Sequence, residues 1–444
     1  MASDRRLNLA AWIGLAVAVT IIVAAIVIPA VTGWEVWANH FPPLHALWAP
    51  HVGLGTVPAI VIALLAVRYA TGAAAQLSWD RLLISAFVAA LLWSASLALV
   101  DGPSGLGAIL ESSYEYLPTA RAITDVPAFL TEFISRIPLD SVDNWPTHVA
   151  GHPPGAVLFF WVLVQLGLGS WQAAGPVVLL IASTTPVAVL ITLRRLGAEQ
   201  PARAAAPFVV LGPSAIWMAV SADGMFTAVA AWGLCCLACA ATSQGWKSTA
   251  PWAIGAGLVL GYGVMLSYGY LLLGVLAVAI LVAARNWRPL LWAIGAALGV
   301  VLSFAAGGFA WWEAYPVLVE RYWDGIATRR PFGYWVWANF AALAISAGPL
   351  VGAAIAAVIA NGRTARDWTA EHRVVVIVAG AAVLSVVLAD LSQMSKGEVE
   401  RIWLPFIPWM LVATAALPER WRRYGLIGQL GFALLVQHLL FTGW

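Results

Sequence analysis

The sequence predicts an all-α polytopic membrane protein, and two observations carry this prediction. Hydrophobic residues make up 62% of the 444 residues and charged residues only 10%, whereas soluble domains contain roughly 25% charged residues. The apolar residues form runs of Ala, Val, Leu and Ile close to the roughly 20 residues that a helix needs to span a bilayer. Because these runs show no strict alternation, they exclude a transmembrane β-barrel, the other fold that satisfies its backbone in lipid.

In chain order, the apolar segments predict about 13 transmembrane helices in a single domain that covers residues 1–444. We expect these helices at residues 9–31, 53–70, 82–100, 173–193, 204–220, 225–241, 252–266, 268–284, 290–310, 336–360, 374–389, 402–417 and 425–440. Residues 9–31 are too long for the apolar core of a cleavable signal. Residues 155–169 are also apolar, but we expect them to lie in the membrane interface. One more span there would reverse the predicted orientation of every later loop relative to the membrane.

The basic residues predict a cytoplasmic N-terminus in the plasma membrane, because cytoplasmic loops are enriched in Lys and Arg. In this orientation 16 of the 23 basic residues lie inside and 7 outside, while 15 of the 21 acidic residues lie outside. The inner set includes Arg363 and Arg366, and the inner acids include Asp367. The function is therefore expected on the periplasmic or extracellular face. A net charge of +2 gives no indication of a nucleic-acid partner.

A polar loop at residues 101–172 follows the third predicted helix and holds most of the outer titratable groups. They are Asp101, Glu111, Glu115, Asp125, Glu132, Asp140, Asp143, His148 and His152. Asp125 precedes a Pro-started helix and is expected to be its N-cap. His148 and His152 have the spacing of two zinc ligands on a helix, but Gly151 and the following Pro-Pro argue against a regular helix there. The usual HExxH motif is also absent, so we expect no metal and no required cofactor.

Three cysteines, Cys235, Cys236 and Cys239, lie within one predicted helix. We expect them to be small core residues rather than metal ligands.

The order of short motifs resembles the GT-C superfamily of glycosyltransferases, which use sugars linked to lipid phosphates. The motifs are an acid directly after a helix (Asp101), Tyr116-Leu-Pro-Thr-Ala-Arg121, His152-Pro-Pro-Gly155, Leu193-Arg-Arg-Leu-Gly197, Pro213-Ser-Ala-Ile-Trp217 with Ser221-Ala-Asp-Gly224, and Glu398-Val-Glu-Arg-Ile-Trp-Leu-Pro405. Two features depart from the family: two additional helices within residues 1–81 precede the family's first helix, and its adjacent Asp-Glu pair is missing.

The resemblance implies inverting transfer of a sugar, arabinofuranose or mannose, from a polyprenyl-phosphate donor to a cell-envelope glycolipid or polysaccharide. Such a transfer needs one carboxylate to take the proton of the acceptor hydroxyl. It also needs positive charge or hydrogen-bond donors to stabilise the leaving phosphate. The candidate bases are Asp101 and Glu115, with Glu111 and Asp223 as a second acid. The candidate phosphate ligands are Arg401, His152, His148 and Lys396, and the substrate contacts are Tyr114 and Tyr116.

Two other functions remain as alternatives. A transporter or flippase of lipid-linked sugars would hold charged residues in mid-membrane and broken helices in paired repeats. A structural membrane subunit would leave the long acidic loop unexplained. The site residues also have simpler interpretations: Arg401 can pair with Glu398 or Glu400, and Asp223 can interact with a helix dipole.

Overall fold

The computed structural model describes residues 2–38, 40–362 and 369–443. Arg363, Arg366 and Asp367, which the charge pattern assigns to the inner face, lie outside the described residues. Within the described part the fold is helical, apart from one two-stranded antiparallel sheet of β1 (Leu47–Trp48) and β2 (Leu440–Phe441). The prediction of an all-α fold is confirmed.

Eight helical segments of the described residues are long and apolar enough to cross a membrane. They are α1 (Ala2–Thr32), α2 (Thr56–Gln76), α3 (Trp79–Ala98), the consecutive pair α8 (Trp171–Ala182) and α9 (Thr185–Arg195), α12 (Ala222–Thr242), α13 (Trp246–Leu266), α15 (Pro289–Ala306) and α19 (Ala370–Leu391). A ninth results if α17 (Phe332–Ala347) and α18 (Leu350–Gly362), which meet at 103°, are taken as one broken span. The expected count of 13 is not confirmed.

The expected span at residues 425–440 lies in the continuous helix α22 (Glu419–Leu439), which is not among the eight. Three other expected spans are shorter or interrupted helices. Residues 199–218 form α10 (Glu199–Val210) and α11 (Ala215–Met218), residues 268–284 form η5 (Tyr268–Leu272) and α14 (Leu273–Ala284), and residues 399–416 form α20 (Val399–Ile402), η8 (Leu404–Phe406), α21 (Ile407–Leu411) and η9 (Val412–Ala416). Pro213 follows the end of α10, and Pro405 and Pro408 lie in the last segment. Proline removes a backbone donor and interrupts the helical ladder, so an apolar run of spanning length does not form one continuous helix.

The polar loop folds into short helices that cover one end of the bundle. They are η1 (Leu99–Asp101), η2 (Pro103–Leu106), η3 (Ala108–Glu111), α4 (Tyr116–Ala122), α5 (Val126–Glu132), η4 (Ile134–Arg136), α6 (Thr147–Gly151) and α7 (Gly155–Gln165). The expected cap of α5 is confirmed, since the backbone N–H of Ala128 donates to Asp125 Oδ1 at 3.0 Å. With 11 residues, α7 is too short to span a bilayer at 1.5 Å per residue.

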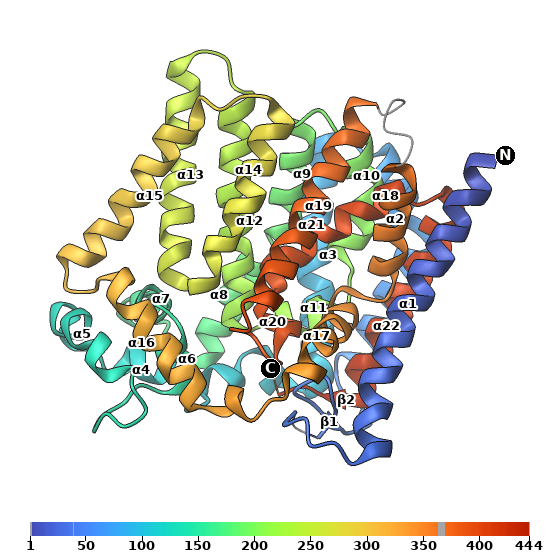
Figure 1. Ribbon diagram of the computed structural model, residues 1–444. Coiled ribbons are helices and arrows are strands. Elements are labelled where there is room, and N and C mark those ends of the chain that lie inside the picture. The colour runs from blue at the N-terminus through green and yellow to red at the C-terminus, as the bar shows by residue number, and fades with distance from the viewer. Residues whose placement is uncertain (1, 39, 363–368, 444) are drawn as a thin grey trace.

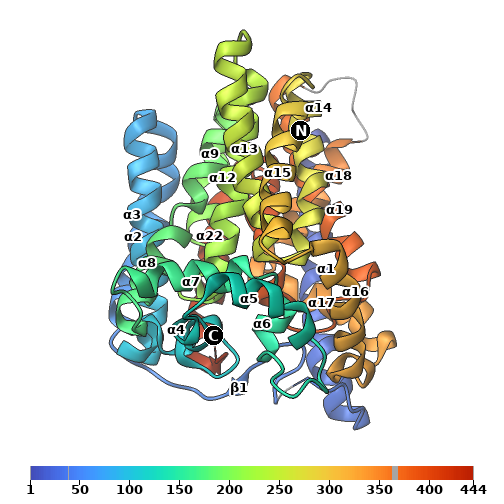
Figure 2. The same ribbon diagram turned by 90° about the vertical axis from the view of Figure 1, so that its left-hand side faces the viewer.

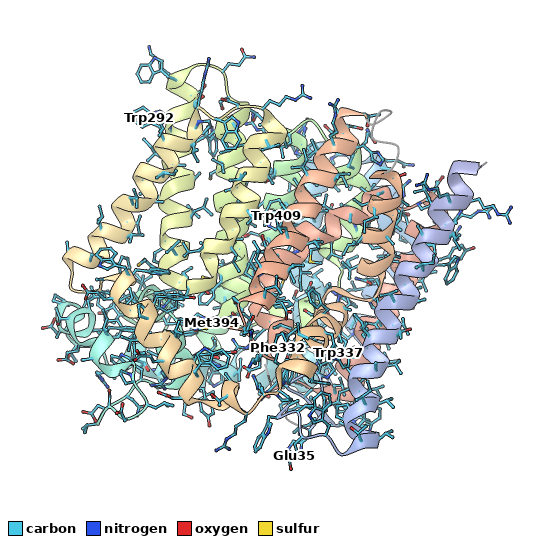
Figure 3. All side chains as sticks on the ribbon, in the orientation of Figure 1. Glu35, Trp292, Phe332, Trp337, Met394 and Trp409 are labelled. Atoms are coloured by element: carbon cyan, nitrogen blue, oxygen red, sulfur yellow. The ribbon has the colours of Figure 1, made fainter. Side chains whose placement is uncertain are left out.

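Figures 1 and 2 show that α4–α7, α16 (Trp311–Asp324) and the β1–β2 pair gather at one end of the molecule, which we call the polar end. The N-terminus of α1 lies at the opposite end. In Figure 3, Glu35, Phe332, Trp337 and Met394 lie toward the polar end, whereas Trp292 lies at the other end. The chain terminates through α22 (Glu419–Leu439) and β2 at the polar end.

Two contacts hold the opposite end together. Arg203 Nη1 donates to the carbonyls of Ala74 and Leu77, each at 2.9 Å, and so satisfies the last turn of α2. Trp421 at the start of α22 donates to Asn8 Oδ1 of α1 at 3.0 Å. The additional N-terminal helices are therefore integral parts of the bundle.

Candidate functional site

Arg401 is the centre of a buried ionic cluster at the polar end. It lies on α20 and is only 4% exposed. Its Nη1 donates to Asp223 Oδ2 at 2.6 Å, and its Nη2 donates to Glu398 Oε2 at 3.1 Å and to His148 Nε2 at 3.0 Å. The first turn of α12, the helix α6 and the loop before α20 therefore meet at one guanidinium.

The hydrogen bonds around His148 fix the position of its proton. A guanidinium can only donate, so His148 Nε2 accepts from Arg401 and the ring proton of the neutral imidazole lies on Nδ1. His148 Nδ1 is 2.7 Å from Glu115 Oε1, and this carboxylate oxygen must therefore accept. Glu115 Oε2 is buried and has no hydrogen-bond partner among the described residues. Glu115 thus has one carboxylate oxygen that is hydrogen-bonded to His148 and one buried oxygen without a hydrogen-bond partner in the described part of the chain.

Arg330 holds the loop that carries Arg401. Its Nε donates to the carbonyl of Trp37 at 3.2 Å, its Nη1 donates to the carbonyl of Lys396, and its Nη2 donates to Glu398 Oε1 at 3.2 Å. Burial alone would raise the pKa of Glu398, but the guanidiniums of Arg401 and Arg330 outweigh it and lower that pKa to about 2. Glu398 is therefore an ionised bridge between two arginines.

The neighbouring Glu400 is fully buried but does not pair with Arg401 through its carboxyl. Its Oε1 accepts from the backbone N–H of His45 at 3.1 Å. Burial raises the pKa of Glu400 to about 7, so this carboxyl is partly protonated near neutral pH. Of the two simple partners expected for Arg401, the structure selects Glu398.

His152 packs beside this cluster as a neutral side chain. Its Nδ1 donates to the carbonyl of His148 at 2.9 Å, and its ring centroid is 5.6 Å from that of Tyr116. Burial lowers the pKa of His152 to about 4, so it carries no positive charge at neutral pH. Tyr116 is buried and stacks on Phe160, whereas Tyr114 is exposed.

The other candidate residues lie outside the cluster. Lys396 Nζ points to the carbonyls of Ala327 and Arg330, each at 3.4 Å, and lies over the ring of Trp323. Glu111 forms an ion pair with Arg121.

Asp101 belongs to a separate group of side chains. Its Oδ1 is 2.8 Å from His51 Nε2, and its Oδ2 accepts from Gln437 Nε2 at 2.7 Å. None of these partners belongs to the Arg401 cluster. The structure thus brings together Glu115, His148, Asp223 and Arg401, and separates Asp101 from them.

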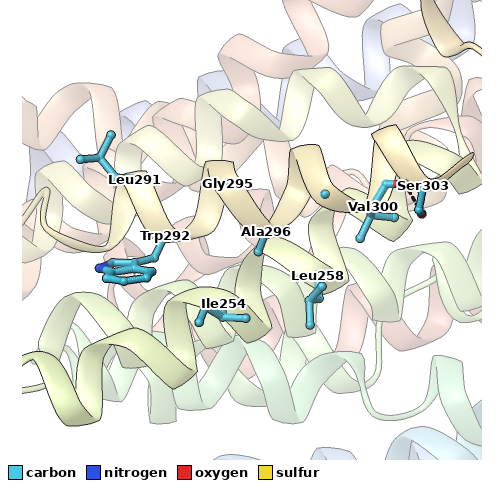
Figure 4. Close-up of a pocket in the computed structure, with 9 residues that line it drawn as sticks. Ile254, Leu258, Leu291, Trp292, Gly295, Ala296, Val300 and Ser303 are labelled. Atoms are coloured by element: carbon cyan, nitrogen blue, oxygen red, sulfur yellow. Dashed lines mark hydrogen bonds between the residues drawn. The ribbon is translucent and has the colours of Figure 1, made fainter. Parts of the chain in front are cut away.

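The hollows on the surface of the described residues include two that differ in character. One, of about 550 Å³, is lined in part by Asp101 and His51. The other, of about 510 Å³, lies between α13 and α15, and Figure 4 shows Ile254 and Leu258 across from Trp292 and Val300. None of the nine residues that line the second hollow is titratable, so it offers no acid–base chemistry. No group of three or more His, Cys, Asp or Glu side chains suited to a metal occurs in the described part of the chain.

No sequence motif indicates that Arg330 or His45 belongs to this site. Arg330 is one of the outer cations available to a leaving phosphate, and no local motif distinguishes it from Arg329. No protein-family model matches this chain, and no curated protein matches it.

Proposed function

We propose that this protein is a membrane glycosyltransferase of the GT-C type, which transfers a sugar from a polyprenyl-phosphate donor to a cell-envelope glycolipid or polysaccharide. The observation that carries the proposal is the chain Glu115–His148–Arg401 at the polar end. It connects a carboxylate that has one buried oxygen, unpartnered among the described residues, to a buried guanidinium through one histidine. The motif resemblance supports the same chemistry and favours arabinofuranose or mannose as the sugar.

Glu115 Oε2 is the base in this mechanism. It takes the proton of the acceptor hydroxyl while the hydroxyl oxygen attacks the anomeric carbon from the face opposite the phosphate. The bond between the anomeric carbon and the phosphate oxygen breaks, and its electron pair leaves with the phosphate, so the configuration is inverted. His148 donates to Glu115 Oε1 and thereby orients the carboxylate for general-base catalysis.

Arg401 stabilises the charge that grows on the leaving phosphate, the usual role of a fixed cation near a developing anion. Asp223 and Glu398 hold its guanidinium in place. The two neutral histidines do not add positive charge, and Lys396 is directed at carbonyl groups. Binding of the leaving phosphate is therefore assigned to Arg401 and not to the two histidines. His148 instead orients Glu115, and His152 packs beside the cluster.

Asp101 is a weaker candidate for the base than Glu115. Both of its oxygens already have partners, and neither partner leads to a buried cation of the Arg401 cluster. The proposal therefore assigns the proton transfer to Glu115 alone.

A flippase of lipid-linked sugars is the second candidate, because one observation favours it. The segments 199–218 and 399–416 are broken helices that pack against each other, and α17 and α18 form a bent pair. Broken helices are frequent at the binding sites of transporters. A flippase would move the donor across the bilayer and leave its glycosidic bond intact.

The experiment is a cell-free assay with membranes that contain the overproduced protein. Radiolabelled polyprenyl-phosphate arabinose and mannose are supplied with glycolipid acceptors, and the label is followed into the acceptor. Transfer that depends on Arg401 supports the enzyme, while movement of intact donor without transfer supports the flippase.

The orientation of the active face is tested separately. A Ser141→Cys variant, in the loop between η4 and α6, should react with a membrane-impermeant maleimide in intact spheroplasts. A matched Ser248→Cys variant, at the start of α13, should react only after permeabilisation. The reverse pattern would place the proposed site in the cytoplasm, away from the expected acceptors.

A further inference from the structure

The hollow beside Asp101 is a second polar site, separate from the Arg401 cluster. Three distant segments build it: residues 49–55, the end of α3 with η1, and the C-terminal end of the chain. The backbone N–H groups of Ala49 and His51 donate to the carbonyls of Leu439 and His438, at 3.0 and 2.9 Å. The hollow has a volume of about 550 Å³.

The protons in this site can be assigned from the hydrogen bonds. The carbonyl of Ala49 only accepts, so the 2.6 Å contact from His51 Nδ1 requires a proton on that nitrogen. The 2.8 Å contact between His51 Nε2 and Asp101 Oδ1 then contains one further proton, whichever of the two groups carries it. The pair of Asp101 and His51 therefore has no net charge.

The pair can still accept hydrogen bonds from a ligand. Both nitrogens of His51 are in use, and Gln437 donates to Asp101 Oδ2, but each carboxyl oxygen has two lone pairs. The side chain of Asp101 is 20% exposed and lines the hollow. A ligand hydroxyl fits this arrangement, since it donates a hydrogen bond without bringing an unbalanced charge. An ammonium group would add a charge that the neutral pair does not compensate.

Apolar side chains form the other wall of the hollow. Val52 and Leu54 are 79% and 69% exposed, and Phe441 lies beside them. Val52 and Leu54 precede α2, whose apolar surface is largely exposed along its length. Apolar side chains at the end of a lipid-facing helix favour contact with acyl chains over water. The hollow thus combines hydroxyl recognition with a lipid-contacting wall.

We propose that this hollow binds the sugar head of a neutral glycolipid, with head-group hydroxyls on Asp101 and an acyl chain along Val52, Leu54 and Phe441. Binding itself is independent of catalysis. The identification of this lipid with the acceptor rests on the proposed glycosyltransferase function.

The test uses the full-length protein in phosphatidylcholine nanodiscs and three lipids with a diazirine in the same acyl chain. The lipids are monoglucosyl diacylglycerol, phosphatidylethanolamine and phosphatidylglycerol. The glucosyl lipid should label peptides that contain residues 52–54 or 441 about five- to tenfold more than the other two, the worth of roughly one hydrogen bond to a carboxylate. Asp101→Ala should abolish this preference, while Asp140→Ala, in an exposed turn, should retain it.

A second variant guards against loss of folding. Asp101 joins three segments, so the folding of Asp101→Ala is checked by thermal unfolding. Leu54→Gln changes an exposed side chain and should lower the labelling by all three lipids. Equal labelling by the three lipids, a preference for either phospholipid, or a glucosyl preference that survives in folded Asp101→Ala overturns the proposal. The labelling experiment measures binding and not sugar transfer. A protein that binds the glucosyl lipid here but transfers no sugar in the cell-free assay therefore contradicts only the catalytic proposal.

Discussion

Replacing Arg401 by methionine should destabilise the protein strongly. The change leaves the carboxylates of Asp223 and Glu398 buried without the guanidinium that contacts them at 2.6 and 3.1 Å. Removing one partner of a buried ion pair costs about 3–5 kcal/mol, because the remaining charge loses its partner but does not regain water. At about 2 °C per kcal/mol, the lower end of the range for larger domains, the unfolding midpoint should fall by roughly 6–10 °C.

The assay is thermal unfolding in detergent, with the fluorescence of the 25 tryptophans as the signal. Arg401→Lys should recover part of the loss, since an ammonium keeps the charge but not the planar fork. The double variant Arg401→Met/Asp223→Asn should be more stable than Arg401→Met, because it removes one of the orphaned charges. Arg329→Met, an exposed neighbour of Arg330, is the matched control and should unfold near the wild-type temperature.

The reasoning is refuted if Arg401→Met unfolds within about 1 °C of wild type, a shift worth well under 1 kcal/mol. It is also refuted if the added Asp223→Asn change lowers stability further. Either result would mean that the Arg401 cluster is not a set of mutually dependent buried charges.

Two further predictions concern pH and backbone conformation. The pKa of Glu398 falls from 4.5 to about 2 on folding and that of His152 from 6.5 to about 4, so in both cases the unfolded chain binds its proton first as the pH falls. The free energy of unfolding should therefore decline between pH 6.5 and 4 through His152 and between pH 4.5 and 2 through Glu398. In a plot of unfolding temperature against pH, His152→Phe should flatten the first interval and Glu398→Gln the second. Profiles of the two variants that run parallel to wild type would contradict the assignments. Gly397→Ala should destabilise the protein by at least about 1–2 kcal/mol, because Gly397 has φ +82° and an added Cβ would lie 2.9 Å from Arg330 Nη1. Gly274→Ala, where a Cβ meets nothing within 4 Å, should be neutral or stabilising by up to about 1 kcal/mol, and equal effects of the two changes would show that the contact is unimportant.

The sequence predicts those parts of the fold that depend on local order. The Asp125 cap follows from Asp125 and Pro127, and the short helix α7 follows from a short apolar run after Pro153-Pro154. The number of membrane-spanning helices depends on whether each apolar segment forms one continuous helix, which hydropathy does not measure. Segments 199–218 and 399–416 have the composition of spans but are interrupted near prolines.

The candidate site is predictable only in its residue types. Glu115, His148, Asp223 and Arg401 stand out because they are polar groups next to apolar segments. Their convergence depends on packing, since His148 and Arg401 are 253 positions apart. Asp101 is the most prominent acid in the sequence because it directly follows a helix, yet its partners His51 and Gln437 are 50 and 336 positions away. Nothing near Asp101 in the sequence indicates that each of its oxygens has a hydrogen-bond partner.

The central claim is that Glu115 is the base of a sugar transfer, and turnover by matched carboxamide variants tests it most directly. Purified wild type, Glu115→Gln and Asp101→Asn are compared for release of polyprenyl phosphate from labelled donor in the presence of acceptor. We predict that Glu115→Gln lowers turnover by roughly 10²–10⁴-fold, the usual contribution of general-base catalysis, with an unchanged unfolding temperature. Asp101→Asn, whose amide oxygen can still accept a hydrogen bond from a head-group hydroxyl, should retain most of the turnover when the acceptor is saturating. Wild-type turnover in Glu115→Gln, or a loss confined to Asp101→Asn, would contradict the account.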